Sequence, residues 1–290
     1  MSLIDTDDAV TSEDSAMGDV ATAVTPVPEP DLGRRRRPTM RSIPWSSVAL
    51  VLVLLAVWEL VGRFAFDSDA VMPPPSAVIA ELFSRWSTYT PHIASTLSAA
   101  AWGWLWGNAV AVSIGILAVI FPFLESWAMR VAVAVTSLPI IALGPIFQVT
   151  LDGNGPKIAL AALSVILTTL VGTIVGLTSV DATSLDLIKA LGGNRWDQMR
   201  RVRFRAALPP FFAALRISAP AAVLGAIIGE FLGRVETGLG VALVNAQRNV
   251  QTDRVWAVAL LATAMAGLGY ALIAYVGRKM TPWVESEVGK

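Results

Sequence analysis

The chain of 290 residues is 54% hydrophobic and only 15% charged, and its 22 basic and 22 acidic side chains leave no net charge. A soluble domain carries about 25% charged residues, so this composition is typical of an integral membrane protein, in which helices satisfy their own backbone groups. The absence of cysteine and the presence of a single histidine, His92, exclude disulfides, thiolate metal sites and histidine metal clusters.

The N-terminal segment differs in composition from the rest of the chain. Residues 1–33 hold eight acidic side chains and no basic one, and a segment with so little apolar surface is expected to be disordered. Arg34–Arg37 follow beside an apolar stretch, which indicates an anchor on anionic headgroups rather than a nucleic-acid site. We therefore divide the chain into an acidic tail with its basic anchor (1–41), a transmembrane domain (42–280) and a cytoplasmic tail (281–290).

Six apolar stretches predict six membrane-spanning helices, each near the length of about 20 residues that a bilayer core requires. Their expected bounds are 43–62, 94–120, 128–151, 157–178, 213–233 and 256–278. With the N-terminus inside, the cytoplasmic segments hold sixteen lysines and arginines and the outer segments hold six. Because positive charges favour the cytoplasmic side, both termini are predicted to be cytoplasmic. The expected fold is an all-α polytopic membrane protein.

Two local patterns refine this outline. The prolines at 73–75 predict an extended turn after the first span, with Ser76 capping a short helix that runs to about Trp86. Glycine pairs four residues apart recur in three spans and predict close packing of helix backbones. These pairs are Gly103 and Gly107, Gly172 and Gly176, and Gly225 and Gly229.

Four residues of the third and fifth spans are candidates for a translocation path or gate. Pro139 and Pro145 interrupt the hydrogen-bond ladder of the third span, and the carbonyls freed in this way either line a path or mark a simple kink. Gln148 either donates to a polar solute or hydrogen-bonds another helix, as does Asn108 in the second span. Glu230 is an acid near membrane depth, and it either hydrogen-bonds a neighbouring helix or shapes an outer gate.

Residues 186–209 form a basic segment between the fourth and fifth spans, with six positive and two negative side chains. Such a segment cannot cross a bilayer and is held at the cytoplasmic surface. We predict a short helix that ends at Gly192-Gly193, where glycine supplies the backbone angles of a sharp turn. Ala190 is small enough to permit close docking on a partner, and Trp196 and Met199 offer apolar anchors. Leu208-Pro209 is expected to start a new helix.

The basic segment resembles the EAA loop of bacterial ABC-importer permeases, whose consensus is roughly E-A-A-x-x-x-G followed by a distal L-P. Asp186 stands for the Glu, Leu187 and Ile188 for the two Ala, and Gly192 for the Gly. Further stretches resemble the nitrate, sulfonate and taurine branch of these permeases, so that the resemblance covers about residues 45–280. The stretches are 136–145, 153–159, Leu215-Arg216, Glu230 and 238–240. Residues 95–100 depart from it, because this branch usually carries an Arg there.

The resemblance implies a transport subunit of a bacterial inner-membrane importer, without enzymatic activity of its own. Its implied partners are a second permease subunit, with a homodimer expected, a cytoplasmic ABC ATPase dimer that binds ATP and Mg, and an external substrate-binding protein. The implied solute is small and polar: nitrate, a sulfonate, taurine or a related compound. The chain has no G-x-x-x-x-G-K-[ST] phosphate loop. Within a coupling loop at 183–212, the expected ATPase-coupling residues are Asp186, Ala190, Gly192, Trp196, Leu208 and Pro209.

Two other functions remain as alternatives. A stand-alone secondary transporter would use proton- or sodium-coupled uptake by the purified chain, but six spans are few and carboxylates at membrane depth are scarce. A membrane enzyme would turn over a lipid without ATP, yet the chain offers few catalytic carboxylates, histidines or metal ligands. A purely topological loop would explain the charges of the basic segment but not the spacing of its Gly, Ala and Leu-Pro.

Overall fold

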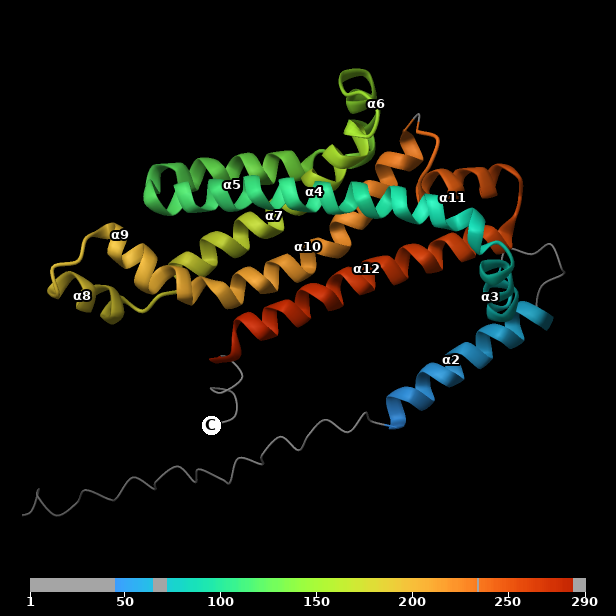
Figure 1. Ribbon diagram of the computed structural model, residues 1–290, viewed down its shortest axis with the longest axis horizontal. Helices are drawn as coiled ribbons and strands as arrows, with labels where there is room; N and C mark the ends of the chain where they lie inside the picture. Colours follow the sequence, from blue (N-terminus) through green and yellow to red (C-terminus); the bar gives the residue numbers. More distant parts are fainter. Residues whose placement is uncertain (1–44, 65–71, 234, 284–290) are drawn as a thin grey trace, which may run out of the picture. The chain divides into compact units, whose positions relative to one another are not determined.

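A computed structural model describes residues 45–64, 72–233 and 235–283, and Figure 1 shows their arrangement. The chain divides into two units, Met1–Ser42 and Ile43–Lys290, and all described residues belong to the second. Within the described ranges the regular elements are helices and no strand is present, which confirms the all-α fold class. The predicted acidic tail, its basic anchor and most of the C-terminal tail lie outside the described residues.

Long apolar helices match most of the predicted spans. Among the described residues, four helices are long and apolar enough to cross a membrane: α4 (Trp86–Ile120), α7 (Gly155–Thr178), α10 (Phe204–Leu232) together with the turns before it, and α12 (Thr252–Met280). Helix α2 (Trp45–Phe64) matches the described part of the first predicted span, residues 45–62. The number of spans, six, and the orientation of the termini stay predictions.

The predicted third span, 128–151, is wrong as a single helix. It consists of α5 (Pro122–Ser137) and α6 (Ile140–Thr150), which are separated at Leu138-Pro139. Proline lacks a backbone donor and restricts the residue before it, so the helix ends at this point. Figure 1 shows α5 beside α4, whereas α6 turns away from both. The 11 residues of α6 extend about 16 Å, roughly half of the ~30 Å thickness of a bilayer core.

The core of the described unit is the packing of α7 against α10 and α4. The glycine pairs lie at these contacts: a Cβ added at Gly107 would lie 2.9 Å from Cα of Ala162, and one at Gly229 would lie 2.6 Å from Cα of Lys157. These distances leave no room for a side chain. The prediction that the glycine pairs bring helix backbones together is therefore confirmed.

Helix α3 (Pro75–Ser84) begins differently from the prediction. Its N-cap is Pro74, which makes no side-chain capping bond. Ser76 instead donates its hydroxyl to Oε1 of Glu59 at 2.7 Å and its backbone N–H to Oε2 at 3.0 Å, and so ties α3 to α2. Helix α4 then begins at Trp86, eight residues before the predicted start of the second span.

A short helix that the sequence reading did not predict lies between α10 and α12. This helix, α11 (Leu239–Arg248), is too short for a span and carries apolar residues on one side. Leu239 packs with buried residues of α3, α4 and α12 in one cluster, whose other members are Val78, Tyr89, Ala257 and Val258. The cluster joins α11 to the N-terminal parts of α3, α4 and α12.

Candidate functional site

Helix α8 (Ala182–Ala190) projects beyond the ends of α7 and α10, as Figure 1 shows. None of its nine described residues is buried. Asp186 and Lys189 form an ion pair at 2.8 Å on its surface, and Leu187 is 60% exposed. A helix that presents apolar side chains outside the spans and buries none of them has a surface available for a partner.

The end of α8 is a glycine-capped turn. Gly192 has a left-handed backbone, with φ +79°. Its N–H donates to the carbonyl of Lys189 at 2.9 Å, and the N–H of Gly193 donates to the carbonyl of Ile188 at 2.9 Å. This pair of bonds is a Schellman motif, which glycine favours because a Cβ is strained at positive φ. The predicted end of the helix at Gly192-Gly193 is confirmed.

The chain re-enters a helix immediately after this turn. The Asn194 side chain accepts the N–H of Asp197 at 2.9 Å, and the Asp197 carboxylate accepts the N–H of Asn194 at 3.1 Å. This reciprocal cap starts α9 (Arg195–Gln198). A π turn, η1 (Met199–Arg203), follows and leads into α10.

The expectation that Leu208-Pro209 starts a new helix is wrong. Both residues lie inside α10, which begins at Phe204 and continues from the π turn. Pro209 removes the donor that would bond the carbonyl of Arg205, and Arg205 is exposed. The helix nevertheless continues through the proline.

Of the two apolar anchors expected in the basic segment, one is exposed and one is buried. Trp196 is 65% exposed, whereas Met199 is only 8% exposed. Met199 packs with Leu177 of α7 and Ala207 of α10. Nearby, the Arg203 guanidinium donates to the carbonyl of Leu177 at 3.2 Å. The π turn is thus joined to the ends of both α7 and α10, and Met199 is not free for a partner.

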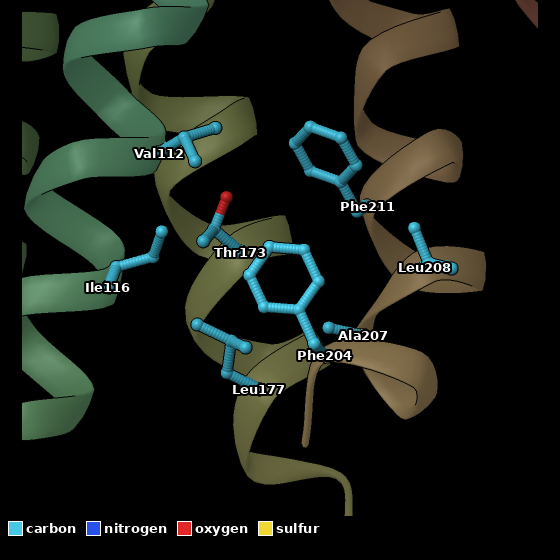
Figure 2. A pocket seen from close by; sticks show the side chains of 8 residues that line it. All are labelled: Val112, Ile116, Thr173, Leu177, Phe204, Ala207, Leu208 and Phe211. Carbon is cyan, nitrogen blue, oxygen red and sulfur yellow. The ribbon is translucent and has the colours of Figure 1, made fainter. Parts of the chain in front are cut away.

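An apolar hollow of about 70 Å³ lies next to this junction. Figure 2 shows side chains from α4, α7 and α10 around it. The lining residues are Val112, Ile116, Thr173, Leu177, Phe204, Ala207, Leu208 and Phe211. The one hydroxyl among them, that of Thr173, donates to the carbonyl of Thr169 at 2.7 Å. The hollow therefore offers no free polar group to a polar solute.

Glu230, a candidate gate residue, is buried at the opposite end of α10 and is 1% exposed. Its carboxylate lies 3.7 Å from Nζ of Lys157, which is also 1% exposed. Thr96 donates its hydroxyl to the carboxylate, 2.7 Å from Oε2, and the N–H of Gly240 donates to Oε2 at 3.1 Å. The charge of Glu230 is therefore paired and hydrogen-bonded, as a buried charge requires.

This ion pair connects four helices. Lys157 Nζ donates to Oγ of Ser95 at 2.7 Å, and the N–H of Leu239 donates to Oγ1 of Thr96 at 2.8 Å. The turn before α11 passes directly over the carboxylate: Gly238 has φ +149°, and an added Cβ would overlap the carboxylate of Glu230. The charged pair thus joins the start of α7, the end of α10 and the start of α11 to α4 at Ser95 and Thr96. No buried side-chain nitrogen or oxygen in the described ranges lacks a partner.

The other candidates for the path lie on α6. Pro139 is the N-cap of α6, and Pro145 lies inside the helix without ending it. The Gln148 side-chain amide donates to the carbonyl of Leu232. Gln148 thus hydrogen-bonds another helix, as does Asn108, whose side-chain oxygen accepts the hydroxyl of Thr169.

The structure separates the two predicted groups of site residues. Pro209 and Glu230 are 21 residues apart on α10, which corresponds to about 32 Å. Sequence reasoning missed Lys157 and Thr96 as partners of Glu230, and Ser95 as a partner of Lys157. One signal was available: Lys157 directly follows Gly155-Pro156 at the edge of an apolar run, and a single cation there is a natural partner for a single carboxylate within the membrane.

Residues 107–282 match the family model described as "Binding-protein-dependent transport system inner membrane component". The chain belongs to this family. This permease is therefore a multi-pass component of a transport system in the inner membrane, which confirms the predicted family.

Two curated relatives and one solved structure illustrate the range of the similarity. The permease is 26% identical to the putative aliphatic sulfonates transport permease protein SsuC of Bacillus subtilis, over 88% of this chain and 94% of that protein. It is 30% identical to the riboflavin transport system permease protein RibX of Chloroflexus aurantiacus, over 87% of this chain and 97% of that protein. An inward-facing structure of the MetNI methionine ABC transporter has a similar fold, with a TM-score of 0.54, 16% identity, and coverage of 66% of this chain and 94% of that chain.

Proposed function

We propose that the permease forms half of the translocation path of an ATP-driven importer, and that α8 docks on a separate cytoplasmic ABC ATPase. The observation that carries this proposal is the exposure of α8, whose described residues are all outside the core while Asp186, Leu187 and Ala190 present a mixed charged and apolar surface. A helix shorter than about 12–15 residues is marginal in isolation. Docking on a partner would stabilise it.

The connections of α8 give this docking a mechanical consequence. A displacement of α8 passes through the capped turn and α9 into the π turn, whose Met199 and Arg203 contact both α7 and α10. These two helices pack more extensively on each other than any other pair among the described residues. ATP binding and hydrolysis on the partner, with its Mg, would therefore move α7 and α10 together.

We assign the remaining parts of the importer as follows. A second copy of the permease completes the path, and an external binding protein delivers a small polar solute such as nitrate, a sulfonate or a taurine-like compound. The sulfonate named for the Bacillus subtilis relative supports this solute class. Pro139, Pro145 and Gln148 on α6 belong to the wall of the path. Glu230 is too buried to contact a passing solute, and it shapes the outer gate by fixing helix ends.

The docking proposal is tested by purifying the tagged permease from its native membranes in mild detergent and identifying its partners by mass spectrometry. Wild type should recover an ABC ATPase. Ala190→Glu should lose it, because the added charge lies on the same face of α8 as Asp186. Leu185→Glu is the matched control: Leu185 is not buried but lies about 140° around the helix from Ala190 and about 160° from Leu187, so the ATPase should be retained.

The same purification separates this proposal from the stand-alone transporter. Absence of an ATPase from wild-type preparations that preserve other membrane complexes, together with gradient-driven uptake by the purified permease, would refute the ATP-driven importer. Equal loss of the ATPase from both glutamate variants would refute the assignment of the docking face.

A further inference from the structure

A second hollow, of about 280 Å³, lies between α10 and α12, at the end of α10 that joins the basic segment. Its wall combines apolar side chains with two cations. Helix α10 contributes Phe212, Ala213 and Arg216, and α12 contributes Ile273, Ala274 and Arg278. The two helices approach closely here: a Cβ added at Gly277 would lie only 3.1 Å from Cβ of Phe212.

The two arginines have no internal counter-charge. Neither forms an ion pair with an acidic side chain within the described ranges, and both side chains are exposed. The only acid of α10 is Glu230, which is 14 residues from Arg216 and paired with Lys157. The only acid of α12 is Asp253, at the opposite end of the helix from Arg278.

The position of Arg216 makes this charge costly. It is the thirteenth residue of α10, about 18 Å along the helix from Phe204, and it lies inside the expected span 213–233. Arginine on a spanning helix is unfavourable unless it reaches an interface or an anionic partner. A suitable ligand must therefore bring negative charge to the arginines and apolar surface to the remainder of the hollow.

We propose that the hollow binds an anionic phospholipid, with its phosphate held by Arg216 and Arg278. Guanidinium groups bind phosphate through paired, charge-assisted hydrogen bonds. Phe212 and Ile273 face the glycerol and upper acyl region, and the acyl chains continue along α12 past Tyr270, which lies on the same side of the helix as Ile273 and Gly277 and is 41% exposed. The Thr281 hydroxyl at the rim already donates to the carbonyl of Gly277 at 2.9 Å, so the arginines are the donors available to the headgroup.

The amphipathic wall favours a lipid over the two other anions that could reach this place. A small soluble anion would leave the apolar part of the hollow unfilled. The acidic side chains Glu285 and Glu287 of the C-terminal segment belong to residues outside those described, and they carry no apolar surface comparable to an acyl chain. Both alternatives are outcomes of the experiment.

The test is native mass spectrometry of the complete permease in detergent, titrated with dioleoyl phosphatidylglycerol or dioleoyl phosphatidylcholine. Wild type should prefer the anionic lipid. Because each basic side chain near a membrane surface contributes about fivefold to binding of an anionic lipid, Arg216→Gln with Arg278→Gln should reduce the preference about 25-fold. The pair Arg216→Lys with Arg278→Lys should retain most of it. Arg248→Gln, an exposed arginine of α11 without an ion pair among the described residues, is the matched control and should bind as wild type.

Several results would overturn the proposal. Equal binding of the two lipids by wild type would do so, as would an unchanged preference in the glutamine pair. Displacement of phosphatidylglycerol by millimolar glycerol 3-phosphate would identify a site for soluble anions instead. If Glu285→Gln with Glu287→Gln raises the affinity for phosphatidylglycerol more than about fivefold, the C-terminal tail occupies the site. If the glutamine pair does not fold, wild type alone decides. Its preference for phosphatidylglycerol over phosphatidylcholine must decrease when salt is raised from 50 to 500 mM, since salt screens charge; an unchanged preference would overturn the proposal.

Discussion

Removal of Lys157 is the sharpest test of the buried ion pair. Its Nζ lies 3.7 Å from Oε1 of Glu230, and both residues are 1% exposed. Lys157→Met keeps the length of the side chain but leaves the carboxylate without a counter-charge, held by hydrogen bonds from Thr96 and Gly240. Breaking a buried pair in this way costs about 3–5 kcal/mol of unfolding free energy. Unfolding with sodium dodecyl sulfate, followed by tryptophan fluorescence, would measure the loss.

The double variant distinguishes an ion pair from two independent effects. Glu230→Gln removes the negative charge, so Lys157→Met combined with Glu230→Gln has no isolated charge and should be more stable than Lys157→Met alone. We expect a coupling energy of about 1–3 kcal/mol between the two positions, at the upper part of the range for contacting residues. If the two single losses instead add to within about 0.5 kcal/mol, the two side chains do not interact and the reasoning is refuted.

Two further predictions concern the turn over the carboxylate and the basic segment. Gly238→Ala should destabilise the permease by about 1–3 kcal/mol because the backbone of Gly238 has a positive φ, and the added Cβ would also overlap Glu230. The control is Gly267→Ala on α12, where nothing lies within 4 Å of the added Cβ. It should be neutral or stabilising in the same unfolding assay. Met199→Ala should cost about 2–5 kcal/mol as a buried truncation, whereas Trp196→Ala should leave stability unchanged and weaken capture of the ATPase. Equal stability loss in Trp196→Ala would contradict its placement on the surface.

Spans with uninterrupted apolar runs were predictable from the sequence, whereas the broken one was not. The expected helix 157–178 matches α7 within two residues, because a glycine turn and a charged stretch bound its apolar run. Proline alone does not reveal where a helix ends. Pro139 ends one, yet Pro145 and Pro209 lie inside helices. The difference depends on which carbonyl loses its donor and what surrounds it, and that is a property of the packed structure.

The candidate sites divide in the same way. The end of α8 at Gly192 was predictable, because a positive φ after a short helix has a local sequence signature. The partner of Glu230 was not, since Lys157 lies 73 residues away along the chain. Arg216 and Arg278 are 62 residues apart in the sequence, and only the structure places them at one hollow. Long-range pairs of charges leave little trace in local sequence patterns.

The π turn at Met199–Arg203 sets the direction in which α8 points. A π turn inside an α-helix carries one residue more than the regular helix needs, so deletion of one residue there would restore an uninterrupted α-helix instead of breaking it. Everything before the deletion would then rotate by about 100° and advance by about 1.5 Å relative to α10. The permease could thus lose a residue, keep α7 and α10, and present α8 to the wrong side. The number of residues in the π turn therefore determines the direction in which α8 faces.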